Sequence, residues 1–107
     1  MIAFPTEYLY ADQLNEAVQT MHQKGMYEQL VFYIEACESG SMFPDLQANI
    51  GVAAMTASNA KESSWATYCP PDDVINGVSI GTCLGDLFSV NWMEDTEANN
   101  PATETLL

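Results

Sequence analysis

The stretch Leu30-Val31-Phe32-Tyr33-Ile34-Glu35-Ala36-Cys37-Glu38-Ser39-Gly40 joins a β-rich apolar run to a turn that is rich in Gly and Ser. The run from Leu30 to Ile34 is apolar without alternation, which is typical of a strand buried on both faces of a parallel sheet. In open α/β sheets, functional groups gather outside the carboxyl ends of the strands. The stretch therefore predicts a buried strand and places Cys37 at the edge where such groups collect.

The segments around this strand predict the other elements of an α/β fold. Upstream, apolar residues recur at roughly helical spacing from Leu14 to Gly25, and Asp12 is a candidate N-cap. Downstream, residues 38–49 are rich in Ser, Gly, Pro and Asp and predict a loop or short helix, whereas residues 50–55 predict a second strand. The order helix, strand, loop, strand indicates an α/β fold with a mostly parallel sheet.

The second half of the chain predicts irregular structure followed by a helix. Residues 69–83 form a polar segment with a cysteine at each end. Asp86 then opens a predicted helix that extends through Trp92, and we expect a loop from Glu94 to Pro101. Two or three parallel strands cannot cover their own edges, so residues 1–107 are expected to form a single domain that is part of a larger sheet.

The composition is that of a globular domain with a strong negative charge. The 107 residues are 48% hydrophobic and 16% charged, which excludes a collagen-like or disordered chain. Fifteen Asp and Glu against two Lys give a formal net charge of −13. This charge repels phosphate backbones and anionic membranes, so we expect no nucleic-acid and no membrane partner. Residues 1–10 also lack the basic region of a signal peptide.

Cys37 is the candidate nucleophile. A thiol between a buried strand and a Gly/Ser turn has the exposure and backbone freedom that nucleophilic catalysis needs. The segment Glu35-Ala36-Cys37 with Gly40 resembles the caspase signature Gln-Ala-Cys-x-Gly, with Glu in place of Gln and one extra residue before the Gly. The alternative is that Cys37 is a small buried hydrophobe at a strand end. Three cysteines are an odd number, so at least one thiol stays free.

Three segments extend the resemblance well beyond one cysteine motif: YIEACESGSM (33–42), TASNAKESSWATYC (56–69) and TCLGDLFSVNWMED (82–95). Together they resemble the legumain family of asparaginyl endopeptidases, with the plant vacuolar processing enzymes the most similar. The resemblance runs from the Phe4-Pro5 turn to Glu104-Thr105-Leu106. It implies a partial caspase-like α/β/α sandwich, a vacuolar or lysosomal location, and a cysteine endopeptidase that cleaves peptides or proteins after Asn through an acyl-enzyme on Cys37. Because a protonated Asp has nearly the shape of Asn, cleavage after Asp is expected at acidic pH.

The resemblance also assigns roles to individual residues. It places the nucleophile at Cys37 and the polar floor of the Asn pocket at Glu35, Ser63 and Asp86. Carboxylates and hydroxyls would accept hydrogen bonds from the Asn amide, whereas the pocket's cationic donor would come from upstream sequence. From the residues alone, Asp86 also fits a helix N-cap and Ser63 an ordinary turn; Glu35 is less ordinary, because a carboxylate in an apolar strand needs a partner or a function.

The same resemblance implies a disulfide between Cys69 and Cys83, which leaves Cys37 free. It implies no metal and no cofactor.

The catalytic histidine is expected to lie outside this sequence. A cysteine peptidase pairs its thiol with a histidine, and in caspase-type enzymes this residue lies about 50 residues upstream. Only 36 residues precede Cys37, and by the resemblance the family's His-Gly pair would fall just before Met1. The only histidine is His22, which we interpret as a solvated helix residue. The backbone N–H of Cys37 is then the only oxyanion donor that this chain would carry.

Two alternatives remain open from the sequence. The chain could be a catalytically inactive, truncated homologue that binds peptides at most. It could also be similar to the transamidase that attaches glycolipid anchors, a sister family with the same Cys and His arrangement but poor similarity in the 56–69 and 83–86 segments.

Overall fold

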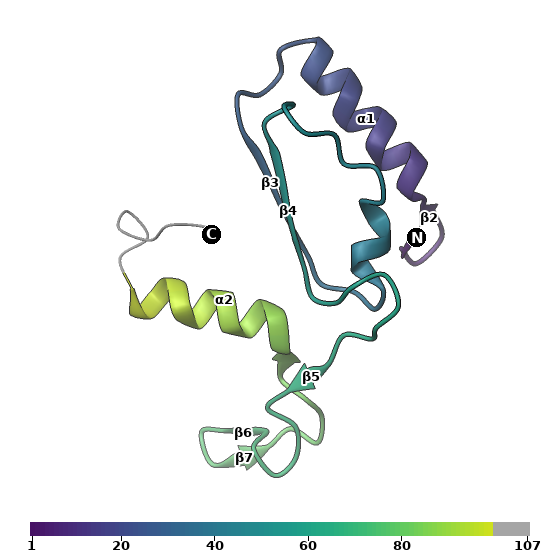
Figure 1. Ribbon diagram of the computed structural model, residues 1–107. Helices are drawn as coiled ribbons and strands as arrows, with labels where there is room; N and C mark the ends of the chain where they lie inside the picture. Colours follow the sequence, from purple (N-terminus) through teal and green to yellow (C-terminus); the bar gives the residue numbers. More distant parts are fainter. Residues whose placement is uncertain (100–107) are drawn as a thin grey trace. The chain divides into compact units, whose positions relative to one another are not determined.

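The computed structural model describes residues 1–99, and residues 100–107, including the Glu104-Thr105-Leu106 stretch, lie outside the described part. The chain divides into two compact units, Met1–Ser64 and Trp65–Leu107, which are considered separately below. The mixed helix and strand content predicted from the sequence is confirmed (Figure 1).

The first unit is built on a parallel pair of strands. β3 (Leu30–Ile34) pairs with β4 (Val52–Thr56) in register, from Leu30 opposite Val52 to Ile34 opposite Thr56. Figure 1 shows the two strands side by side, with the carboxyl ends at the same edge. The unit also contains β1 (Ile2–Ala3), β2 (Tyr8–Leu9), α1 (Ala11–Gln23) and the short 3-10 helix η1 (Ser39–Met42).

The expectation that β3 is buried on both faces is wrong for this chain. Leu30, Phe32 and Ile34 are half-buried, and the Phe32 ring contacts Phe43 with ring centroids 5.5 Å apart. Val31 and Tyr33, which point to the opposite face, are 41% and 44% exposed. Side chains alternate between the faces of a strand, so the alternating exposure shows that one face is covered much more than the other.

The first unit has a small hydrophobic core, and α1, which contributes to it, starts slightly earlier than predicted. Val18 of α1, Met42 of η1 and Ile50 are its buried hydrophobic side chains. Asp12 lies in the first turn of α1 and not at the cap; its Oδ1 accepts the Gln13 N–H at 2.9 Å.

The second strand begins two residues later than predicted because Gly51 turns the chain. Gly51 has φ +67°, and a Cβ at this position would lie 2.5 Å from the carbonyl oxygen of Glu28. Only glycine fits this conformation and this close approach.

The second unit contains a helix, a short strand pair and a disulfide-closed loop. The predicted helix after Asp86 is confirmed as α2 (Leu87–Ala98), but the loop expected from Glu94 is wrong as far as Ala98, because the helix continues through these polar residues. β5 (Ala66–Thr67) pairs with β8 (Gly85–Asp86) in an antiparallel arrangement at the start of α2. The Tyr68 hydroxyl donates a hydrogen bond to the Glu94 carboxylate of α2, and this contact raises the pKa of Tyr68.

The loop between residues 69 and 83 is more ordered than its composition predicted. A disulfide joins Cys69 to Cys83. Inside the loop, β6 (Val74–Ile75) and β7 (Val78–Ser79) form a hairpin whose Asn76-Gly77 turn has positive φ at both residues, as a type I′ turn requires.

Asp73 is the polar centre of this loop. Its side chain is only 1% exposed, and Oδ2 accepts the Ser79 hydroxyl at 2.7 Å and the Gly81 N–H at 2.5 Å. These two hydrogen bonds, the Ser79 bond foremost, hold the pKa of Asp73 below its ordinary value.

Candidate active site

Cys37 lies just beyond the carboxyl end of β3, on the edge where the sequence placed it. It is exposed and is the free cysteine of the described chain. The Ala57 N–H donates to the Ile34 carbonyl at 3.0 Å, so the chain leaving β4 remains paired with the end of β3. The thiol is therefore presented at the end of a paired strand, and the buried-hydrophobe interpretation of Cys37 is wrong.

Two buried serines fix the backbone around the thiol. Ser58 Oγ donates to the Ala36 carbonyl at 3.1 Å and accepts the Ser39 N–H at 3.2 Å, so it bridges the residues on either side of the Cys37-Glu38 pair. Ser39 Oγ in turn accepts the Ser58 N–H at 3.1 Å. Because both serines are buried, these bonds are shielded from water and hold the turn in one geometry.

The residues after Cys37 complete this turn. Glu38 adopts the left-handed conformation with φ 54°, and its N–H donates to the Glu62 carbonyl at 2.7 Å. At Gly40, a Cβ would lie 3.0 Å from backbone atoms of Asn59 and Ala60, so a larger residue would push the two segments apart. Within residues 1–99, no hydrogen bond engages the Cys37 N–H. This leaves the N–H available to an oxyanion.

The thiol lies among hydroxyls of the segment that follows β4. Cys37 Sγ is 3.5 Å from Ser64 Oγ. Hydrogen bonding from the Ser64 hydroxyl, followed by that from the Ser64 N–H, lowers the pKa of Cys37, and the Ser63 hydroxyl adds to the effect. Desolvation and the Glu38 carboxylate oppose the shift. A lower pKa increases the fraction of thiolate, which is the nucleophilic form.

The structure brings three of the four predicted site residues into the first unit. Glu35 is half-buried two residues before Cys37, and its Oε1 atom is buried. Ser63 is exposed and supplies one of the hydroxyls near the thiol. Asp86 belongs to the second unit, at the N-cap position of α2, where its side chain forms no capping hydrogen bond. Its carboxylate is thus not used as a helix cap, and its place in the pocket stays a prediction.

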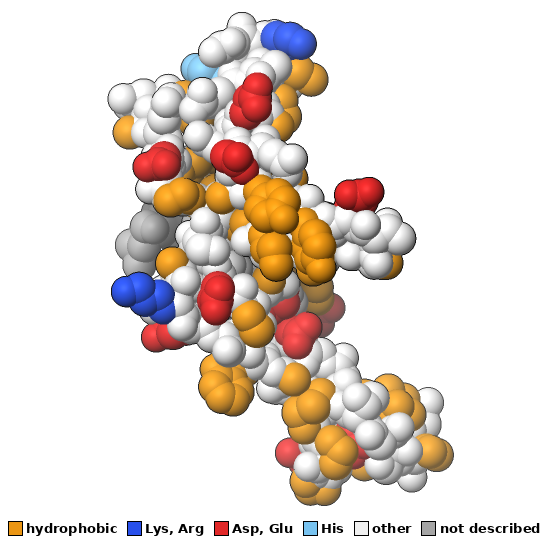
Figure 2. All heavy atoms as spheres, turned by 90° about the vertical axis from the view of Figure 1, so that its right-hand side faces the viewer, with side chains coloured by type: hydrophobic (Ala, Val, Ile, Leu, Met, Phe, Trp, Pro, Cys, Tyr) orange, Lys and Arg blue, Asp and Glu red, His pale blue; other side chains and the backbone are white. Residues whose placement is uncertain are grey.

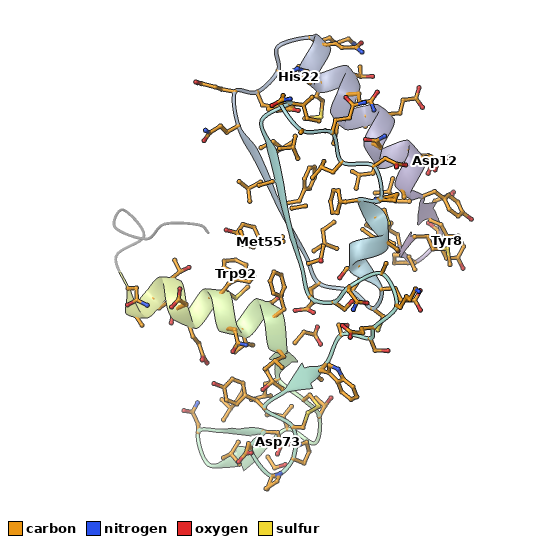
Figure 3. All side chains as sticks on the ribbon, viewed as in Figure 1. Tyr8, Asp12, His22, Met55, Asp73 and Trp92 are labelled. Atoms are coloured by element: carbon orange, nitrogen blue, oxygen red, sulfur yellow. A yellow bond between two sulfur atoms is a disulfide. The ribbon has the colours of Figure 1, made fainter. Side chains whose placement is uncertain are left out.

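His22 and the Cys37 thiol lie toward opposite ends of β3. His22 lies in the last turn of α1, which leads into the start of β3, whereas Cys37 follows the end of β3. Figure 3 shows His22 at this far end of α1. The His22 side chain is exposed, and its ring centroid lies 6.1 Å from that of Tyr27.

Sequence reasoning missed the three serines that hold the nucleophile: Ser39, Ser58 and Ser64. Ser64 could have been suspected, because it adjoins Ser63 in a segment already singled out. No pattern in the sequence pairs Ser39 with Ser58.

The described residues contain neither a metal centre nor a membrane helix. In residues 1–99 no group of three or more His, Cys, Asp or Glu side chains could hold a metal ion. No helix in this part of the chain has the length and apolar character needed to cross a bilayer.

An exposed, activated thiol at the carboxyl end of a parallel strand is the arrangement of a cysteine nucleophile. The model of the Peptidase C13 family matches residues 1–107, and the chain belongs to this family.

The chain is 53% identical over 100 residues to a vacuolar-processing enzyme of Vicia sativa, an alignment that covers 92% of this chain and 20% of that protein. It is 49% identical over 108 residues to a vacuolar-processing enzyme of Citrus sinensis, which covers 99% of this chain and 22% of the relative.

The similarity extends to an animal protein. The chain is 45% identical over 106 residues to legumain of Mus musculus, with 99% of this chain and 23% of legumain aligned. The resemblance to the legumain family is thereby confirmed. The chain spans about a fifth of the length of these curated relatives.

Proposed function

We propose that this chain carries the nucleophile and part of the substrate pocket of a cysteine endopeptidase that cleaves after Asn, and after Asp as the pH falls. The observation that carries the proposal is Cys37, an exposed free thiol with a lowered pKa on a serine-braced turn. Membership of the Peptidase C13 family supports the same chemistry. The relatives' names support a vacuolar or lysosomal location.

The proposed reaction uses the exposed thiol of Cys37 as its nucleophile. Cys37 Sγ attacks the carbonyl carbon of the scissile bond, and the Cys37 N–H donates to the oxygen as it gains negative charge. The C–N bond breaks, the leaving amine takes a proton, and a thioester remains on Cys37 until water releases the acid. A histidine is required to transfer these protons, and we propose that it comes from sequence outside residues 1–107, together with the cationic residue of the pocket.

The pocket proposal rests on hydrogen-bond chemistry. Glu35, Ser63 and Asp86 offer acceptors to the two amide N–H donors of an Asn side chain. A protonated Asp has nearly the same shape and offers one O–H donor, whereas an ionised Asp would bring like charges together. Free Asp has a pKa of about 3.9, so acceptance of Asp is expected to increase as the pH falls. We propose a caspase-like α/β/α sandwich, with a mostly parallel sheet that includes β3 and β4, as the frame of this site.

The test uses the full-length protein and two peptides that differ only in Asn or Asp at the scissile position. We expect the Asn peptide to be cleaved throughout the range from about pH 4 to about pH 7, and the Asp peptide only toward the acidic end. Glu35→Gln and Asp86→Asn should weaken the preference for Asn over Asp near neutral pH, while Glu28→Gln, outside the proposed pocket, should not. Equal cleavage of both peptides at all pH values would disprove the pocket. No cleavage by a folded full-length protein would favour an inactive, peptide-binding homologue.

A further inference from the structure

A groove in the first unit has no role in the proposed reaction. It has a volume of about 570 Å³ and lies between residues 10–19, which include most of α1, and residues 42–46, with Met1 also in its wall. This volume is within the usual range for ligand sites. Cys37, Glu35 and Ser63 are all absent from its lining, so the groove is separate from the nucleophile and from the pocket residues of the same unit.

The floor and rim of the groove are apolar. The buried side chains of Val18 and Met42 form part of the floor, together with half-buried Leu14, Phe43 and Leu46. Tyr10 lies at the rim and is 49% exposed, and its ring lies 6.4 Å from that of Tyr8. Figure 2 views the side of the molecule that carries α1 and the N-terminus, where hydrophobic side chains gather with acidic ones beside them. The groove thus has an apolar binding surface next to two exposed aromatic rings, those of Tyr8 and Tyr10.

The charged side chains that line the groove are all acidic. They are Asp12 and Glu16, four residues apart on α1, and Asp45 on the opposite segment. No Lys, Arg or His lines it. Residues four apart on a helix lie on the same face, so the two helix carboxylates point along one wall. A ligand with positive charge on one side and an apolar surface on the other is complementary to this arrangement.

We propose that this groove binds a basic, amphipathic peptide segment of a partner protein. An apolar side chain of the segment lies on the Val18 and Met42 floor, and its cationic side chains pair with Asp12, Glu16 and Asp45. Arg suits the site better than Lys, because its planar guanidinium group binds a carboxylate with two N–H donors and stacks on an aromatic ring such as Tyr10.

The charge of residues 1–107 disfavours other occupants of the groove. Residues 1–107 of a second copy carry two Lys and no Arg against fifteen acidic residues, so this part of a copy is a poor source of the complementary charge. Anionic lipid surfaces and nucleic acids are repelled for the same reason. A purely apolar ligand would fit the floor but leave the three carboxylates without a partner.

The probe is a fluorescent peptide of about twelve residues with Leu at helical spacing and Arg between, without Asn or Asp. Binding is measured by fluorescence anisotropy to the full-length protein carrying Cys37→Ala, so that the result does not depend on peptidase activity. A second peptide has Gln in place of every Arg. We expect the Arg peptide to bind at least about tenfold more tightly than the Gln peptide, a difference of about 1.4 kcal/mol.

Two matched triple variants separate the groove from the general negative charge. D12N/E16Q/D45N removes the three groove carboxylates, and E28Q/D72N/E97Q removes three exposed carboxylates that do not line it. The first should weaken binding of the Arg peptide by about tenfold or more, the second by less than about twofold. Asp45→Arg should act in the same direction as the first triple variant.

Three outcomes would overturn the proposal. Absence of binding by the Arg peptide would show that the groove is not a basic-peptide site. Equal binding of the Gln peptide would show that it takes neutral apolar ligands. Equal losses in the two triple variants would show that the attraction comes from the net charge of the protein and not from the groove.

Discussion

Replacing Ser58 by Ala should loosen the turn that presents Cys37. Ser58 Oγ is the partner of both the Ser39 N–H and the Ala36 carbonyl, at 3.2 and 3.1 Å. Its removal leaves these two backbone groups without their partner. Each buried, unsatisfied group costs about 1–3 kcal/mol, so for the two groups together the free energy that keeps this turn closed should fall by about 2–6 kcal/mol.

Hydrogen exchange with mass spectrometry measures this loss locally in the full-length protein. Peptides that contain the Ser39 and Gly40 amides should exchange about 30-fold faster or more, since 2 kcal/mol corresponds to roughly that factor. Ser41→Ala is the matched control, because the Ser41 hydroxyl forms no hydrogen bond within residues 1–99. The control should change the exchange rate by about twofold at most. Similar exchange in the two variants would refute the bracing role of Ser58.

Three further predictions concern the Cys37 thiol, the loop of residues 69–83 around Asp73, and the histidine proposed to lie outside residues 1–107. Ser64→Ala should raise the pKa of Cys37, so the pH profile of its alkylation by iodoacetamide should move to higher pH; an unchanged profile would contradict the role of Ser64. The pKa of Asp73 is lowered in the folded state, so its carboxylate should stabilise the 69–83 loop at pH values above the ordinary Asp pKa of about 3.9. This stabilisation should be lost as the pH falls through the lower, folded-state pKa. Hydrogen exchange of the loop amides should then become faster in the unchanged protein, but not in Asp73→Ala. Purified residues 1–107 should not cleave Asn peptides, and turnover that Cys37→Ala abolishes would show that they contain their own base.

Local sequence patterns were enough to predict the main elements of the fold. The apolar run from Leu30 to Ile34 predicted β3, and the aliphatic spacing after Asp12 predicted α1, whose N-cap is Tyr10, two residues before the predicted Asp12. The far end of α2 was missed because residues 94–97 are polar, and polar residues on an exposed helix give no periodic apolar signal. The exposed face of β3 was missed because an unalternating apolar run carries no information about which face is covered.

The site shows where sequence reasoning stops. Cys37, Glu35 and Ser63 could be proposed from short segments and from the resemblance to one family. The Ser39 and Ser58 pair could not, because nineteen residues separate them and only the parallel register of β3 and β4 brings them together. The effect of Ser64 on the thiol likewise depends on a 3.5 Å contact across 27 residues of sequence.

The most direct test of the account is covalent capture of the nucleophile. The full-length protein is treated with a peptide whose scissile Asn carries an electrophile in place of the amide bond, and the labelled residue is identified by peptide mass spectrometry. A matched Gln peptide serves as the specificity control. The account predicts a single adduct on Cys37, formed with the Asn reagent and abolished by Cys37→Ala. An adduct on any other residue, or peptidase activity that persists in the folded Cys37→Ala variant, would contradict it.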